Sequence, residues 1–73
     1  MERFQITLAA ARVNAGFTQD EAAKRLGVNT GTLRNYEKGT AFPDVPMIKK
    51  IEDLYQVSYD NLVFLRPDIT VKP

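Results

Sequence analysis

Two helix starts and two helix stops lie between Thr18 and Gly39, and their spacing constrains the fold more than any other feature of the sequence. Thr18 and Glu21 stand three residues apart, which is the capping-box pattern at the beginning of a helix. Gly27 ends that helix, because glycine adopts the left-handed backbone of a helix end without steric cost. Asn29 then caps a second helix after a very short connection. The sequence therefore predicts two short helices joined by a tight glycine turn.

Further helices are predicted on both sides of this pair. The first follows Thr7 and runs to about Ala15, and the pair itself covers residues 19–26 and 30–38. A fourth helix begins after Asp44, with an apolar stripe of Val45, Ile48, Ile51, Leu54 and Tyr55. A last short helix is expected after Ser58, with Leu62 and Leu65 inside it.

The fold class that follows is all-α, with five helices and no sheet, because no strand-length run alternates apolar and polar residues. A chain of 73 residues and 8.2 kDa is expected to form one small domain. Residues 1–65 are assigned to this domain. Residues 66–73 are assigned to an irregular C-terminal tail, because they combine prolines with mixed polarity.

The composition excludes several kinds of chemistry. Cysteine and histidine are both absent, which excludes disulfides, Cys/His zinc sites, thiol nucleophiles and histidine acid–base catalysis. A metal site would have to use carboxylates such as Asp44, Glu52, Asp53 and Asp60. Cap or helix-surface positions account for Asp44 and Asp60, and the adjacent Glu52 and Asp53 would point about 100° apart on a helix. We therefore expect neither an enzyme nor a cofactor, metal ion or small-molecule substrate.

The chain is expected to be cytoplasmic and free of membrane segments. Its apolar runs fall far short of the ~20 residues that a membrane span requires, and the absence of cysteine is compatible with a reducing compartment. The net charge is only +1. Residues 1–40 carry an excess of basic side chains and the remainder an excess of acidic ones, so a surface that binds a polyanion is expected in the first half.

In the second helix of the pair, one face is not needed for packing against the rest of the domain. Leu33, Tyr36 and Glu37 share one side by helical spacing. The opposite side carries hydrogen-bonding or small residues: Gly31, Arg34, Asn35 and Lys38, with Thr30 at its N-terminal edge. This arrangement is typical of a helix-turn-helix.

Residues 17–39, FTQDEAAKRLGVNTGTLRNYEKG, resemble the helix-turn-helix of the Cro/C1 repressor family, also called the XRE family. Residues 43–62 resemble the family's fourth and fifth helices, so the resemblance spans about residues 6–65. It implies a five-helix, lambda-repressor-like domain that binds double-stranded operator DNA as a transcriptional regulator, usually as a homodimer. A steric phage-type repressor is the function expected.

The resemblance also implies roles for individual residues. Gln19 matches a residue that contacts a backbone phosphate, and Arg12 and Glu37 match a buried ion pair between the first and third helices. The positions that face DNA are Thr30, Gly31, Thr32, Arg34 and Asn35, with Lys38 as a phosphate neighbour. Gly31 departs from the family because it has no side chain with which to read a base.

Several alternatives remain open at this stage. Thr32 is a candidate local cap as well as a DNA contact, and Gln19 and Lys38 have ordinary surface interpretations. Residues 62–65 could form a dimer surface, or Leu62 and Leu65 could close the core. The chain could also be the DNA-binding antitoxin of a toxin–antitoxin pair, or a helix-turn-helix module used for protein–protein interaction.

Overall fold

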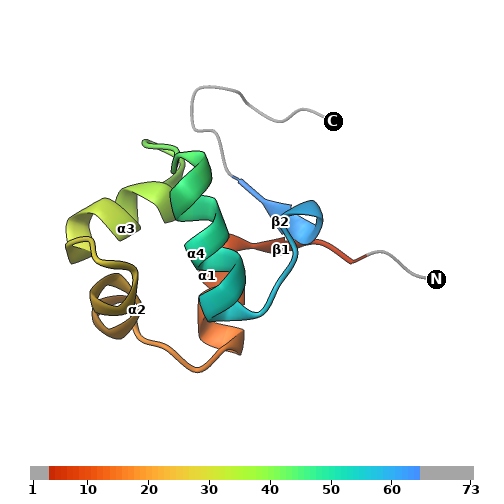
Figure 1. Cartoon of the computed structure of the whole chain (residues 1–73), viewed down its shortest axis with the longest axis horizontal. Helices are drawn as coiled ribbons and strands as arrows, with labels where there is room; N and C mark the ends of the chain where they lie inside the picture. The colour runs from red at the N-terminus through yellow and green to blue at the C-terminus, as the bar shows by residue number, and fades with distance from the viewer. Residues whose placement is uncertain (1–3, 65–73) are drawn as a thin grey trace.

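The computed structural model describes residues 4–64, which form a small helical domain with a minimal pair of strands (Figure 1). In chain order, the elements are β1 (Ile6–Thr7), α1 (Leu8–Asn14), α2 (Gln19–Leu26), α3 (Thr30–Lys38), α4 (Val45–Tyr55), the 3-10 helix η1 (Tyr59–Asn61) and β2 (Leu62–Val63). The expectations for Leu65 and for the 66–73 tail lie outside the described residues.

The caps that begin the helices are those that the sequence predicts. The Thr18 hydroxyl accepts the Glu21 amide at 3.1 Å, and a Glu21 carboxylate oxygen accepts the Thr18 amide at 2.9 Å. The side chain of Asn29 accepts the Thr32 amide at 2.8 Å. Each bond satisfies an amide that has no partner inside its own helix. The capping box and the start of α3 are therefore confirmed.

Glycine ends both helices of the central pair. Gly27 follows α2 at φ +81° and Gly39 follows α3 at φ +86°. A side chain is strongly disfavoured at these angles, so the two glycines set where α2 and α3 stop. The bounds of α2 and α3 agree with the prediction.

The core lies where the four α-helices meet. Ala22 and Ala23 are buried on α2, and their small side chains let the neighbouring helices approach closely. Leu26 and Leu33 are buried beside them, with Val28 packed against the same cluster. The other members of the buried core are Leu8, Ala11, Ile51, Tyr55 and Leu62.

The mostly helical fold is as predicted, but the expectation of a fifth helix and no sheet is not met at the two ends of the described domain. Ser58 caps only one 3-10 turn, and Leu62 then adopts an extended backbone at φ −86° and ψ 137°. Strands β1 and β2 pair in parallel, with Ile6 opposite Leu62 and Thr7 opposite Val63. Leu62 therefore closes the core from a strand, where a fifth helix was expected. The backbone partner lies at the far end of the sequence, so local periodicity contains no sign of it.

The predicted apolar stripe of α4 is also wrong at its first residue. Ile51 and Tyr55 are buried as expected, whereas Val45 is 66% exposed. Met47 packs against the core from the same first turn of the helix. Val45 belongs instead to an exposed apolar surface beside the loop after α3.

Candidate nucleic-acid interface

Helix α3 has one packed face and one exposed face. Leu33 is fully buried and Tyr36 packs against the core, so Tyr36 serves packing. Arg34, Asn35 and Lys38 are exposed. The helix is held at both ends by caps and along one side by the core, so its exposed side is a rigid polar surface.

The two threonines of α3 have their hydroxyl protons committed to neighbouring side chains. Thr30 Oγ1 donates to Asp20 Oδ1 at 2.8 Å, which joins α3 to α2. Thr32 Oγ1 donates to Asn29 Oδ1 at 2.9 Å, so Thr32 contributes to the local cap. Gly31 lies between them in ordinary helical conformation, without a positive φ. The side-chain donors of α3 that remain available to a ligand are therefore those of Arg34, Asn35 and Lys38.

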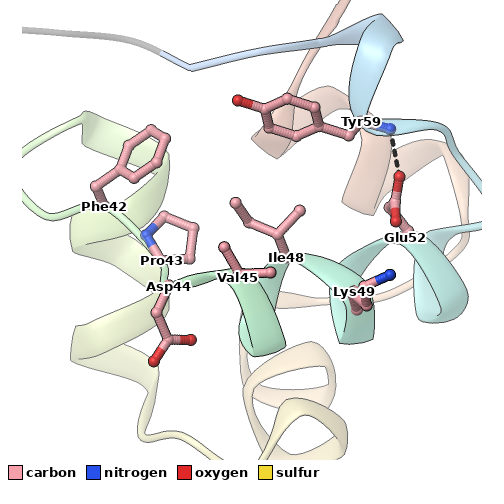
Figure 2. A pocket seen from close by; sticks show the side chains of 8 residues that line it. All are labelled: Phe42, Pro43, Asp44, Val45, Ile48, Lys49, Glu52 and Tyr59. Carbon is pink, nitrogen blue, oxygen red and sulfur yellow. Dashed lines mark hydrogen bonds between the residues drawn. The ribbon is translucent and has the colours of Figure 1, made fainter.

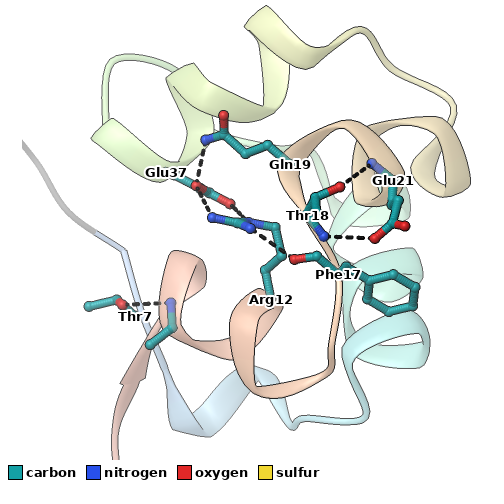
Figure 3. Close-up of polar contacts among 8 residues, drawn as sticks. Thr7, Arg12, Phe17, Thr18, Gln19, Glu21 and Glu37 are labelled. Carbon is teal, nitrogen blue, oxygen red and sulfur yellow. Dashed lines mark hydrogen bonds and ion pairs between the residues drawn. The ribbon is translucent and has the colours of Figure 1, made fainter.

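A charged network ties α1, α2 and α3 together behind this face (Figure 3). Arg12 Nε contacts Glu37 Oε2 at 2.7 Å, and the two side chains are only 13% and 6% exposed. Arg12 Nη1 also donates to the Phe17 carbonyl at 2.9 Å. The structure thus joins the two residues that the resemblance assigns to a buried ion pair.

Gln19 is part of the same network. Its Nε2 donates to Glu37 Oε1 at 2.9 Å, as Figure 3 shows. A side-chain amide nitrogen carries two hydrogens, so one remains for another acceptor. The contact fixes the Gln19 side chain at the first residue of α2, the position for which a phosphate contact was expected.

Tyr55 has a hydroxyl that finds no hydrogen-bond partner among the described residues. The side chain is 5% exposed and its ring lies 6.3 Å from that of Phe17. Burial raises the pKa of Tyr55 to about 12, with a further contribution from the negative charge of Glu37. The phenol therefore stays neutral next to the ion pair at physiological pH.

An apolar groove of about 530 Å³ lies between the start of α4, the loop before it and η1 (Figure 2). Phe42 and Tyr59 are 60% and 46% exposed there. Phe64, which packs against the core, lies with its ring centroid 4.9 Å from that of Phe42. The lining residues are Phe42, Pro43, Asp44, Val45, Ile48, Lys49, Glu52 and Tyr59. The dimer surface considered at residues 62–65 must exclude Leu62, because that side chain is buried.

The acids considered for metal binding have structural tasks or stand apart. Asp44 accepts the Met47 amide and Glu52 accepts the Tyr59 amide. Within residues 4–64, no three histidine, cysteine or acidic side chains gather as metal ligands would. The same residues include no helix with the length and apolar character needed to cross a bilayer.

Sequence reasoning missed the two contacts that organise the polar face, Asp20 with Thr30 and Gln19 with Glu37. Each joins residues on different helices, so helical spacing within either element does not reveal it. Asp20 has an ordinary first-turn position on α2, where acidic residues are favoured by the helix dipole. Nothing in the linear pattern indicates that its partner lies on α3.

Comparison with known families resolves the classification of this arrangement. A family model described as helix-turn-helix matches residues 8–62, from the start of α1 to the start of β2. The chain belongs to this helix-turn-helix family. The Cro/C1-type resemblance is thereby confirmed.

Three relatives illustrate the range of this helix-turn-helix family. The HTH-type transcriptional regulator ImmR of Bacillus subtilis is 43% identical over 56 residues, which cover 77% of this chain and 44% of that protein. The cryptic phage CTXphi transcriptional repressor RstR of Vibrio cholerae is 33% identical over 60 residues, 82% of this chain and 54% of the repressor. YazB of Bacillus subtilis, an uncharacterized HTH-type transcriptional regulator, is 33% identical over 55 residues, 75% of this chain and 80% of YazB. The chain spans about half the length of the first two relatives.

Proposed function

We propose that this chain is a sequence-specific DNA-binding transcriptional regulator of the repressor type, with α3 as its recognition helix. The observation that carries the proposal is the exposed polar face of α3, where Arg34, Asn35 and Lys38 stand on a helix held by caps and core. The names of the relatives, two regulators and a phage repressor, support the same function. Such a regulator acts in the compartment that holds the DNA, which for a bacterial protein is the cytoplasm.

The proposed contacts follow from donor and acceptor chemistry. Arg34 is the side chain on α3 that can donate a bidentate pair of hydrogen bonds to guanine O6 and N7 in the major groove. Asn35 can pair with adenine in the same way. Lys38 and the second amide hydrogen of Gln19 are directed to backbone phosphates, which fix the register of the protein on the duplex. Occupation of an operator would then block polymerase access.

We further propose that the chain binds DNA as a two-fold dimer. One copy offers two base-reading side chains, Arg34 and Asn35, because Gly31 has none. At about 1–3 kcal/mol for each good base contact, one copy reaches only the lower part of the roughly 4–10 kcal/mol that separates specific from nonspecific binding. Two copies reach the whole range. Two-fold symmetry then places the half-sites about 10 bp apart, centre to centre.

Selection of bound duplexes from a random pool tests both proposals. The expected result is enrichment of an inverted repeat, and insertion of about half a helical turn between its half-sites should abolish tight binding. Arg34→Ala provides the matched control in the same selection and should lose enrichment at one base position of each half-site. Unchanged affinity for the lengthened site would overturn the dimer, and absence of any enrichment would overturn DNA recognition.

The second candidate function is a module for protein–protein interaction. The exposed apolar groove with Phe42 and Val45 on its rim favours it, because apolar side chains at such exposure are typical of contact surfaces. The two functions predict different results in the selection. A protein-interaction module would enrich no duplex, and its binding to a partner protein would be unaffected by Arg34→Ala.

A further inference from the structure

We propose that Asp20 determines specificity by making the start of α3 unfavourable for backbone phosphate, so that nonspecific binding is weakened more than binding to the operator. This inference rests on the proposed DNA-binding function and adds a residue to it. Asp20 lies on α2 and has no role among the expected DNA contacts. In the structure it lies beside Thr30, the first residue of the recognition helix.

The hydroxyl of Thr30 is already engaged by Asp20. A threonine hydroxyl has a single hydrogen, and here Thr30 Oγ1 donates it to Asp20 Oδ1 at 2.8 Å. Phosphate oxygens accept hydrogen bonds and do not donate them. While the contact with Asp20 persists, the Thr30 side chain cannot donate to phosphate and offers only its lone pairs.

The carboxylate of Asp20 also changes the charge at the start of α3. The N-terminus of a helix attracts anions through its free amides and its dipole. At α3, however, the Thr32 amide is bound by the side chain of Asn29, and the exposed carboxylate of Asp20 adds a negative charge. A phosphate that approaches this end of α3 therefore meets a like charge at close range.

A DNA base differs from a phosphate in what it offers to Asp20 and Thr30. A base edge carries no net charge, and cytosine N4 and adenine N6 donate hydrogen bonds into the major groove. The acceptors on Asp20 and Thr30 match such an amino group. In the operator, a base amino group that donates to Asp20 or Thr30 compensates for the repulsion between the carboxylate and the DNA. A random sequence that meets α3 only through its phosphates has no such compensating hydrogen bond. Asp20 therefore increases the ratio of specific to nonspecific affinity.

The test compares Asp20→Asn with Asp60→Asn, which removes the same charge from an exposed position on η1. Asparagine keeps an oxygen that can accept the Thr30 hydroxyl, so the local structure is preserved. Affinity is measured for the duplex recovered by selection and for a scrambled duplex of equal composition, at two salt concentrations. We expect Asp20→Asn to raise affinity for the scrambled duplex about three- to tenfold at low salt. Affinity for the selected duplex should rise less, so the ratio of specific to nonspecific affinity falls.

A second variant separates charge from hydrogen bonding. Thr30→Val removes the hydroxyl and retains the carboxylate, so affinity for the scrambled duplex should not rise. The inference would be overturned if wild type and Asp20→Asn had the same ratio of affinity for the selected duplex to affinity for the scrambled duplex. It would also be overturned if Asp20→Asn and Asp60→Asn changed these affinities equally. Neither result would contradict DNA binding itself. Failure of the wild-type protein to bind either duplex would overturn the proposed function itself, and this inference with it.

Discussion

Gln19 and Arg12 donate to the same carboxylate, that of Glu37, and both contact its Oε1. The Gln19 amide reaches Oε1 at 2.9 Å and the Arg12 guanidinium reaches Oε2 at 2.7 Å. The network thus orients a surface residue through a partly buried ion pair. An amide held in this way loses little conformational entropy when a phosphate binds its second hydrogen.

Removal of either partner of the ion pair is expected to destabilise the domain strongly. Glu37→Ala and Arg12→Ala each leave a largely buried charge without its counter-ion, at a cost of about 3–5 kcal/mol in the free energy of unfolding. A double variant with well-packed apolar residues should lose much less. Urea melts provide the measurement, with the exposed Asp53→Ala as control. If either single variant lost almost no unfolding free energy, the ion pair would contribute little to stability and the prediction would be wrong.

Arg34→Ala and Gln19→Ala are expected to affect DNA binding differently. Arg34→Ala should weaken the selected site by about 1–3 kcal/mol and relax one base position. Gln19→Ala should weaken all sequences similarly, because a phosphate contact carries no sequence information. Binding to the selected and the scrambled duplex distinguishes the two. Equal losses on both duplexes for Arg34→Ala would remove the base-reading role.

Gly31→Ala is expected to stabilise the domain. The residue has no positive φ, and an added Cβ would meet Asn29 Oδ1 at 3.5 Å, which is an ordinary contact. Alanine is favoured over glycine in a helix by up to about 1 kcal/mol. Thermal melts should therefore show a higher Tm. If the same variant binds the selected duplex more weakly, the DNA approaches the backbone closely at this position; a lower Tm would contradict the prediction.

Tyr55 is expected to make stability fall at high pH. Its pKa rises from 10.0 to about 12 on folding, so below pH 10 the phenol is neutral in both the folded and the unfolded state and its ionisation takes nothing from the stability. As the pH passes from 10 to 12, the unfolded state ionises while the folded state does not, so the free energy of unfolding falls by up to about 1.4 kcal/mol for each pH unit.

Tyr55→Phe isolates this contribution from the other groups that titrate in the same range. At neutral pH the variant should be close to wild type or more stable, because it removes a buried hydroxyl without a partner. The difference in unfolding free energy between the two proteins, measured by urea melts from pH 8 to pH 11.5, should shift in favour of Tyr55→Phe. A difference that is independent of pH would contradict the assignment.

The helices of the central pair could be predicted because their signals are local. The capping box needs Thr18 and Glu21 at a fixed spacing, and Gly27 supplies a backbone conformation at one position. The family assignment follows from the same residues. The faces of α3 also follow from the sequence, since helical geometry alone separates Leu33 from Arg34.

Tertiary structure decided everything that depends on contact between distant segments. Leu62 is apolar in either a helix or a strand, and only its pairing with Ile6 makes it a strand residue. Val45 has the right spacing for the core, yet the core does not extend as far as the first turn of α4 on that side. The bonds of Gln19 with Glu37 and of Asp20 with Thr30 arise from the crossing of α2 and α3. The sequence by itself determines the helices of the central pair, because their caps are local hydrogen bonds. The hydrogen-bond partners of the polar side chains on α2 and α3 are decided by packing, which brings separate helices within hydrogen-bond distance.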